Sequence, residues 1–240
     1  MISSYVTYPE DKSTHHAVLF LTDGFGHEFI NNRLVADQLA ANGYFVVMPD
    51  LFDGDAVPAD TRPADFDLQG WLAKHQTPVV DPIVASVLKG MRGTLGCKRV
   101  GAVGYCFGAK YVVRFLKGGE SIDTGFVAHP SLVEFDEIRG IKGPLSIAAA
   151  GKSRTAPNKS LWLQFTTNNS RESDFIFDNA KRHQSEDILA EMKATYQVVL
   201  YSGTEHGFAI RADLSKKHLR FAKEQAFLQA VRWLDEYVKA

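Results

Sequence analysis

The hexapeptide Gly104-Tyr-Cys-Phe-Gly-Ala109 constrains the fold of this chain more than any other segment. It follows an apolar run at 99–103 and precedes a helix-like stretch at 110–116. A strand, Gly-x-Cys-x-Gly and a helix form the layout of a nucleophile elbow, with cysteine where serine is usual. The nucleophile of such a turn has a strained backbone, so the residues two positions away on either side have to be small.

This layout predicts that Cys106 lies at the edge of a sheet, beside the first turn of the next helix. That position favours a thiolate and offers backbone N–H groups to an oxyanion. The alternative is plain packing, because cysteine is among the most buried residue types. The functional interpretation therefore depends on whether a base and an acid follow along the chain.

Strand-like and helix-like segments alternate over the whole sequence, which predicts an α/β fold with a mostly parallel central sheet and helices on both faces. No repeat or boundary interrupts the pattern, so residues 1–240 are expected to form a single domain. Strands are predicted at 17–22, 44–48, 99–105, 125–129, 144–150 and 196–201. Helices are predicted at 28–42, 79–95, 107–117, 179–193 and 214–239.

Composition excludes several classes of function. The formal net charge is −1 over 240 residues, which gives no support to nucleic acid or an anionic membrane as a partner. No apolar run approaches the roughly 20 residues of a membrane span, and the first residues do not resemble a signal peptide. No metal-ligand spacing or phosphate-binding loop is present. We expect a small-molecule partner, no cofactor, no metal, and a monomer or homodimer.

The chain has two cysteines, Cys97 and Cys106, at opposite ends of the predicted strand 100–105. An extended strand of that length holds them beyond disulfide reach. Together with the missing signal peptide, this favours a cytoplasmic location, where Cys106 stays reduced. Cys97 is expected to pack without a chemical role.

His206 is the best candidate base among eight histidines. It follows the last predicted strand, the place of the base in the Ser–acid–His order of α/β-hydrolases. The other histidines in polar or helical contexts are expected at the surface: His15, His16, His75, His183 and His218.

The acid should follow the strand 144–150, but residues 151–171 contain no carboxylate. Asp174 is the first choice, and Glu172 and Asp178 are its rivals. The alternative is that all three are surface carboxylates or cap the helix 179–193.

Asp23 ends the first long strand, where ligand-binding residues of open α/β sheets gather. In the same loop, the N–H of Gly24 could join that of Phe107 as an oxyanion hole. An ordinary Asp-Gly turn is the alternative. Phe25, Phe107, Phe208 and His129 could line an aromatic pocket or simply fill the core.

Four blocks together resemble the dienelactone hydrolase family, closest to its fungal-type members. They are Gly-Tyr-Cys-Phe-Gly at 104–108, Glu-His-Gly-Phe-Ala at 205–209, Thr-Asp-Gly-Phe-Gly at 22–26 and Pro-Asp-Leu-Phe-Asp-Gly at 49–54. The resemblance implies an α/β-hydrolase fold and cleavage of a lactone or ester. It also implies Cys106 as nucleophile, His206 as base, Asp174 as orienting acid, Asp23 as the residue that activates the thiol, and Arg211 as a contact for a substrate carboxylate.

Residues 151–171 are an atypical insert relative to that family, and their deletion would restore Ala-Ala-Ala-Glu-Ser-Asp. One hypothesis is a retained intron; the other is a real loop beside the acid that shapes the pocket or displaces Asp174. Two other functions therefore stay open. One is a catalytically altered or inactive family member that acts as a pathway tailoring enzyme or binding protein; the other, ranked last, is a redox-sensing thiol.

Overall fold

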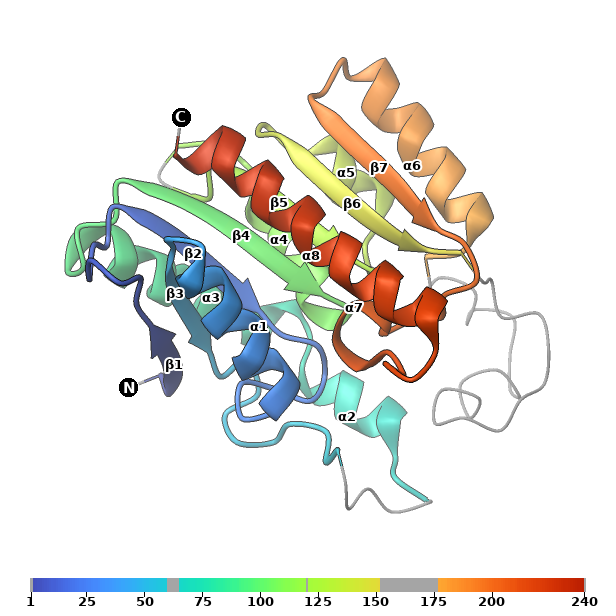
Figure 1. Cartoon of the computed structure of the whole chain (residues 1–240), viewed down its shortest axis with the longest axis horizontal. Helices are drawn as coiled ribbons and strands as arrows, with labels where there is room; N and C mark the ends of the chain where they lie inside the picture. The colour runs from blue at the N-terminus through green and yellow to red at the C-terminus, as the bar shows by residue number, and fades with distance from the viewer. Residues whose placement is uncertain (1, 60–64, 120, 152–176, 240) are drawn as a thin grey trace.

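A seven-stranded sheet forms the centre of the computed structural model, which describes residues 2–59, 65–119, 121–151 and 177–239 (Figure 1). The strand order is β1-β3-β2-β4-β5-β6-β7. β1 pairs antiparallel with β3, and every other neighbouring pair is parallel. The strands are β1 (Ser4–Thr7), β2 (His16–Leu21), β3 (Phe45–Pro49), β4 (Arg99–Tyr105), β5 (Thr124–Ala128), β6 (Leu145–Ala150) and β7 (Tyr196–Tyr201).

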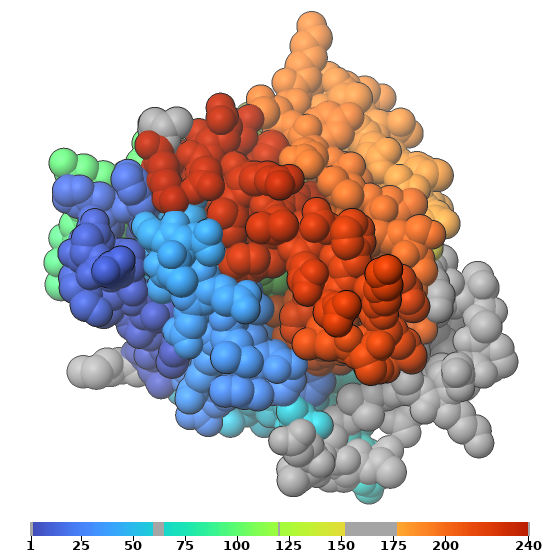
Figure 2. Space-filling view, viewed as in Figure 1, coloured from blue at the N-terminus to red at the C-terminus, as the bar shows by residue number. Residues whose placement is uncertain are grey.

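Helices cover both faces of this sheet. One face carries α1 (Ile30–Ala41), α7 (Phe208–Arg211) and α8 (Lys217–Val238), and α1 and α8 dominate the surface in Figure 2. The other face carries α2 (Leu68–Lys74), α3 (Thr77–Gly93), α4 (Phe107–Phe115), α5 (Phe135–Arg139) and α6 (Asn179–Glu191). The predicted α/β layering is confirmed.

The central strands are apolar on both sides because each side meets a helical layer. In β2, Val18 and Phe20 belong to the core beneath α1 and α8, whereas Leu19 and Leu21 belong to the opposite core. Alternate side chains of a strand point to opposite faces, so a strand buried on both faces needs a continuous apolar run. This is why the long strands are visible in the sequence.

The pattern did not reveal β1, α2, α5 and α7, which have only four to seven residues each. Such segments are too short for a clear hydrophobic period. The omission of α2 made one prediction wrong. His75 at the end of α2 was expected at the surface, but it is buried against Trp71 and contacts Asp55.

The sheet topology brings distant loops to one edge. Parallel strands place their carboxyl ends together, and ligand sites of open α/β sheets lie in the crevice beyond those ends. Here the loops after β2, β4, β5 and β7 carry Asp23, Cys106, His129 and His206 respectively. Both cysteines, Cys97 and Cys106, are free and buried. No helix within the described ranges is long and apolar enough to cross a bilayer.

Candidate active site

Cys106 occupies a strained turn between β4 and α4, with φ 52° and ψ −109°. Gly104 and Gly108, on either side of Cys106, have neighbouring atoms so close that a larger side chain does not fit at either position. A methyl group on Gly104 would lie 2.6 Å from Val112 Cγ2, and one on Gly108 would collide with the Leu21 carbonyl. The elbow geometry predicted from the sequence is therefore present, and it fixes the thiol at the carboxyl end of the central strand.

His206 lies beside this thiol. It sits in the loop between β7 and α7, and its Nε2 is 2.9 Å from Cys106 Sγ. The following Gly207 has a left-handed backbone (φ 90°) and begins α7. This contact gives the thiol a neighbouring imidazole that can accept its proton.

Ser131 also reaches the thiol, and sequence reasoning missed it. Its Oγ is 3.6 Å from Cys106 Sγ, and its backbone N–H donates to the Cys106 carbonyl at 3.1 Å. The only signal available was its place, three residues after the apolar strand Thr124–Ala128 and at the edge where the other candidates lie.

Asp23 is fully buried beside the same loop edge. Its Oδ1 accepts hydrogen bonds from the Phe25 amide at 3.2 Å and from Asn32 Nδ2 at 3.1 Å. Its Oδ2 lies 3.5 Å from Arg211 Nε, and the Arg211 guanidinium lies over the Phe25 ring, 4.8 Å from the centroid. Arg211 thus lies against the Asp23 loop, within ion-pair distance of a buried carboxylate.

Burial dominates the electrostatics of this group. Desolvation raises the pKa of Asp23, and Arg211 opposes the rise. Desolvation and then the Asp23 charge raise the pKa of Cys106 to about 11, against the opposing effects of Arg211, Ser131 and the Phe107 amide. The start of α4 favours the thiolate as expected, since the Phe107 amide lowers the pKa of Cys106, but desolvation by burial outweighs it.

Of the three candidate acids, the structure describes only Asp178. Glu172, Asp174 and all of the insert 151–171 except Gly151 lie outside the described residues. Asp178 is the N-cap of α6, and its carboxylate accepts a hydrogen bond from the Lys181 amide at 2.8 Å.

The two predicted oxyanion donors are Phe107, the first residue of α4, and Gly24. The Phe107 amide lowers the pKa of the Cys106 thiol. Gly24 lies in the loop after β2, where its carbonyl accepts the Val57 amide at 2.8 Å. The role of Gly24 as an oxyanion donor stays a prediction.

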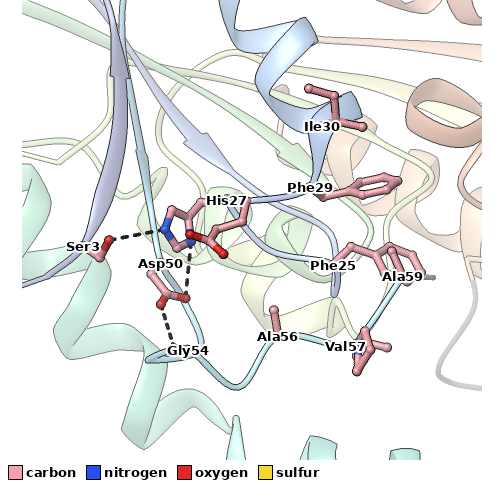
Figure 3. Close-up of a pocket in the computed structure, with 12 residues that line it drawn as sticks. Ser3, Phe25, His27, Phe29, Ile30, Asp50, Gly54, Ala56, Val57 and Ala59 are labelled. Atoms are coloured by element: carbon pink, nitrogen blue, oxygen red, sulfur yellow. Dashed lines mark hydrogen bonds and ion pairs between the residues drawn. The ribbon is translucent and has the colours of Figure 1, made fainter. Parts of the chain in front are cut away.

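A pocket of about 700 Å³ has Phe25 in its lining (Figure 3). At its polar end, His27 lies between Ser3 and Asp50, with Nε2 3.3 Å from Ser3 Oγ and Nδ1 3.7 Å from Asp50 Oδ1. The rest of the lining is mostly apolar: Phe25, Phe29, Ile30, Ala56, Val57, Pro58 and Ala59. Phe25 connects this pocket with Arg211, because its ring contacts both Phe29 and the Arg211 guanidinium.

The arrangement as a whole suits nucleophilic catalysis. It combines a thiol on an elbow, an imidazole within hydrogen-bonding distance, and a buried carboxylate paired with an arginine. Across the part of the chain that the structure describes, no group of three or more His, Cys, Asp or Glu side chains is placed to hold a metal ion.

Known proteins resemble this chain over nearly its whole length. The family model described as "Dienelactone hydrolase family" matches residues 2–238. The hydrolase pyvD of Aspergillus violaceofuscus is 50% identical over 99% of this chain and 88% of its own length. "Dienlactone hydrolase 1" of Gibberella moniliformis is 31% identical over 98% of this chain and 84% of its own length.

Solved structures show the same fold. A putative dienelactone hydrolase from Klebsiella pneumoniae superposes with a TM-score of 0.74 at 14% identity, over 98% of this chain and 93% of that one. The expected α/β-hydrolase fold is thereby confirmed. With the family model spanning nearly its whole length, the chain belongs to the dienelactone hydrolase family.

Proposed function

We propose that this protein hydrolyses a lactone or carboxylic ester, with Cys106 as the nucleophile and His206 as the general base. One observation carries the proposal: His206 Nε2 lies 2.9 Å from a thiol held on a strained elbow. The printed name of the Gibberella relative, a dienlactone hydrolase, supports the same class of substrate.

In the acylation step, the Cys106 S–H proton passes to His206 and the thiolate attacks the substrate carbonyl carbon. The carbonyl oxygen becomes an oxyanion, for which the Phe107 and Gly24 amides are the proposed donors. Collapse of this intermediate breaks the ester C–O bond, and the leaving oxygen takes the proton from His206. A lactone substrate stays attached as a hydroxyacyl thioester.

In the deacylation step, His206 removes a proton from water, which attacks the thioester carbonyl. The C–S bond breaks, the sulfur recovers its proton, and the free carboxylic acid leaves. One water is consumed for each ester bond cleaved. Neither step needs a cofactor, and Asp174 is the proposed group that orients the His206 ring.

Asp23 and Arg211 set the charge around the thiol. At neutral pH the sulfur is protonated because of burial and the Asp23 charge, so the thiolate forms only when the proton is transferred to a neighbouring group. This protects the resting thiol, since the thiolate is the reactive form of cysteine. Arg211, within reach of the Asp23 carboxylate, is the proposed contact for a carboxylate on the substrate.

A second candidate is a family member with altered or lost activity that acts as a tailoring enzyme or binding protein. The observation that favours it is the acid-free insert 151–171 before Asp174. A cytoplasmic location also belongs to the proposal, because a reducing compartment keeps both thiols free.

Hydrolysis of a panel of lactones and aryl esters by the wild type, Cys106→Ala and Cys97→Ala tests the proposal. We expect the wild type and Cys97→Ala to hydrolyse at least one lactone or ester, and Cys106→Ala to lose that activity. Activity that survives in Cys106→Ala would contradict the mechanism. A wild type inactive on the whole panel would favour the second candidate.

A further inference from the structure

The turn His129-Pro-Ser131 after β5 touches both members of the thiol–imidazole pair. Its backbone is anchored on two sides: the His129 amide donates to Ala148 O at 2.8 Å, and the Ser131 amide donates to Cys106 O at 3.1 Å. His129 has φ 38°, a left-handed conformation that histidine adopts at a cost. The chain therefore holds this turn in a strained shape against the elbow.

Ser131 presents its hydroxyl to the sulfur. The residue is 2% exposed, and Oγ lies 3.6 Å from Cys106 Sγ. A hydroxyl can donate to a thiolate, and hydrogen bonds to a charged partner are stronger than those to a neutral one. The contact therefore stabilises the deprotonated sulfur more than the thiol.

His129 presents its ring to His206. The two rings meet at 67° with centroids 5.0 Å apart, and Phe208 packs on the His129 imidazole at 5.6 Å. His129 is 1% exposed, and neither of its ring nitrogens has a hydrogen-bond partner among the described residues. Because these nitrogens make no hydrogen bond within the described part of the chain, the His129 ring contributes to the Cys106–His206 pair through its shape, by packing against His206.

We propose that this turn is a working part of the site, with Ser131 as a hydrogen-bond donor to the Cys106 thiolate and His129 as a positioning residue for His206. The inference rests on the proposed function, because it takes Cys106 as nucleophile and His206 as base. Ser131 touches the reacting sulfur and is thus a catalytic residue in this scheme, whereas His129 acts through His206.

The charge state of His129 suits this role. Burial, the neighbouring His206 and Arg211 lower the pKa of His129 well below its usual value, so it stays neutral at physiological pH. A neutral ring leaves His206 free to carry the single positive charge that forms when it takes the thiol proton. A second imidazolium at this distance would oppose that transfer.

Alkylation of Cys106 by iodoacetamide as a function of pH tests the Ser131 arm without any substrate. We expect Ser131→Ala to move the midpoint of the profile up by about one pH unit, and Ser131→Thr, which keeps a hydroxyl, to restore it in part. Ser146→Ala is the matched control, since it removes another buried hydroxyl, one that accepts a hydrogen bond from Gln229 of α8 and, within the described ranges, forms no hydrogen bond with Cys106. A Ser131→Ala profile that superimposes on the wild-type profile would overturn this arm.

His129→Phe and His129→Ala test the positioning arm. Phenylalanine keeps a ring against His206, whereas alanine removes it. At neutral pH we expect His129→Phe to keep alkylation of Cys106 within about threefold of wild type and His129→Ala to slow it about tenfold or more. Equal rates in the wild type and His129→Ala, or equal losses in both variants, would overturn the arm; near-UV circular dichroism identifies any variant that fails to fold.

These outcomes are separable from the proposed function. If the wild type hydrolyses no lactone or ester but the alkylation shifts appear, the hydrolase proposal fails and the turn keeps its assigned role. If hydrolysis depends on Cys106 but the shifts are absent, the inference fails alone.

Discussion

His206 Nε2 lies 2.9 Å from Cys106 Sγ, although the two residues are 100 positions apart in the chain. The contact exists because β4 and β7 end at the same edge of the sheet, so that Cys106, directly after β4, meets the loop after β7. It joins a strained elbow to the loop before a single-turn helix.

Replacement of His206 by alanine removes the proposed proton acceptor. We expect kcat/KM to fall by about 10²- to 10⁴-fold, the usual contribution of a positioned general base. Steady-state hydrolysis of the best substrate measures it. His218→Ala, at an exposed position of α8, is the control and should leave the rate unchanged; equal losses in both variants would count against the assignment.

Asp23→Asn should lower the pKa of Cys106. The negative charge of Asp23 disfavours the thiolate and helps to raise the pKa of Cys106 to about 11. Removal of that charge therefore favours the thiolate. Alkylation of Cys106 should therefore have its midpoint at lower pH and proceed faster near pH 8. Asp37→Asn, on the exposed side of α1, should have no effect. A midpoint that stays or rises in Asp23→Asn would contradict this account.

The identity of the acid can be tested with three isosteric variants. Asp174→Asn should reduce kcat by about a hundredfold or more, because loss of the orienting carboxylate leaves the imidazole misaligned. Glu172→Gln and Asp178→Asn should be near wild type. Asp178 caps α6, and asparagine is an equally good N-cap, so Asp178→Asn should also keep its melting temperature. A larger loss in either rival would reassign the acid.

Phe29→Ala tests whether the pocket beside Phe25 receives part of the substrate. Phe29 lines that pocket and packs on Phe25, with ring centroids 5.2 Å apart. We expect KM for bulky aryl esters to rise several-fold, because an aromatic contact in the pocket is lost, while a small acetyl ester is unaffected. Phe221→Ala, at a 60% exposed position of α8, is the control. Equal KM changes for both esters would show that the pocket has no part in selecting them.

Two glycine substitutions should change stability in opposite directions. Gly108→Ala places a methyl group against the Leu21 carbonyl and should destabilise the protein by about 3 kcal/mol. Gly90 lies inside α3 and faces open space among the described residues, so Gly90→Ala should stabilise the protein by about 0.5–1 kcal/mol. Urea unfolding measures both; similar effects would refute the steric account of the elbow.

Local sequence was sufficient for several features of this protein. The long strands and helices are visible because burial on both faces imposes continuous apolar runs, and the cysteine elbow because its small neighbours lie at fixed positions. His206 was found by its place after the last long strand. The short elements β1, α2, α5 and α7 have too few residues for a period, so burial of His75 against α2 was not foreseen.

Only the tertiary structure decided how the site is assembled and charged. The contacts of Ser131 and His129 with Cys106 and His206, and the pairing of Arg211 with Asp23, join loops far apart in the chain. The pKa of Cys106 depends on desolvation by all the layers packed around it, which no local pattern encodes. The sequence by itself thus determined the cysteine turn and the order of the elements; three-dimensional packing determined which side chains meet the thiol and that burial raises its pKa.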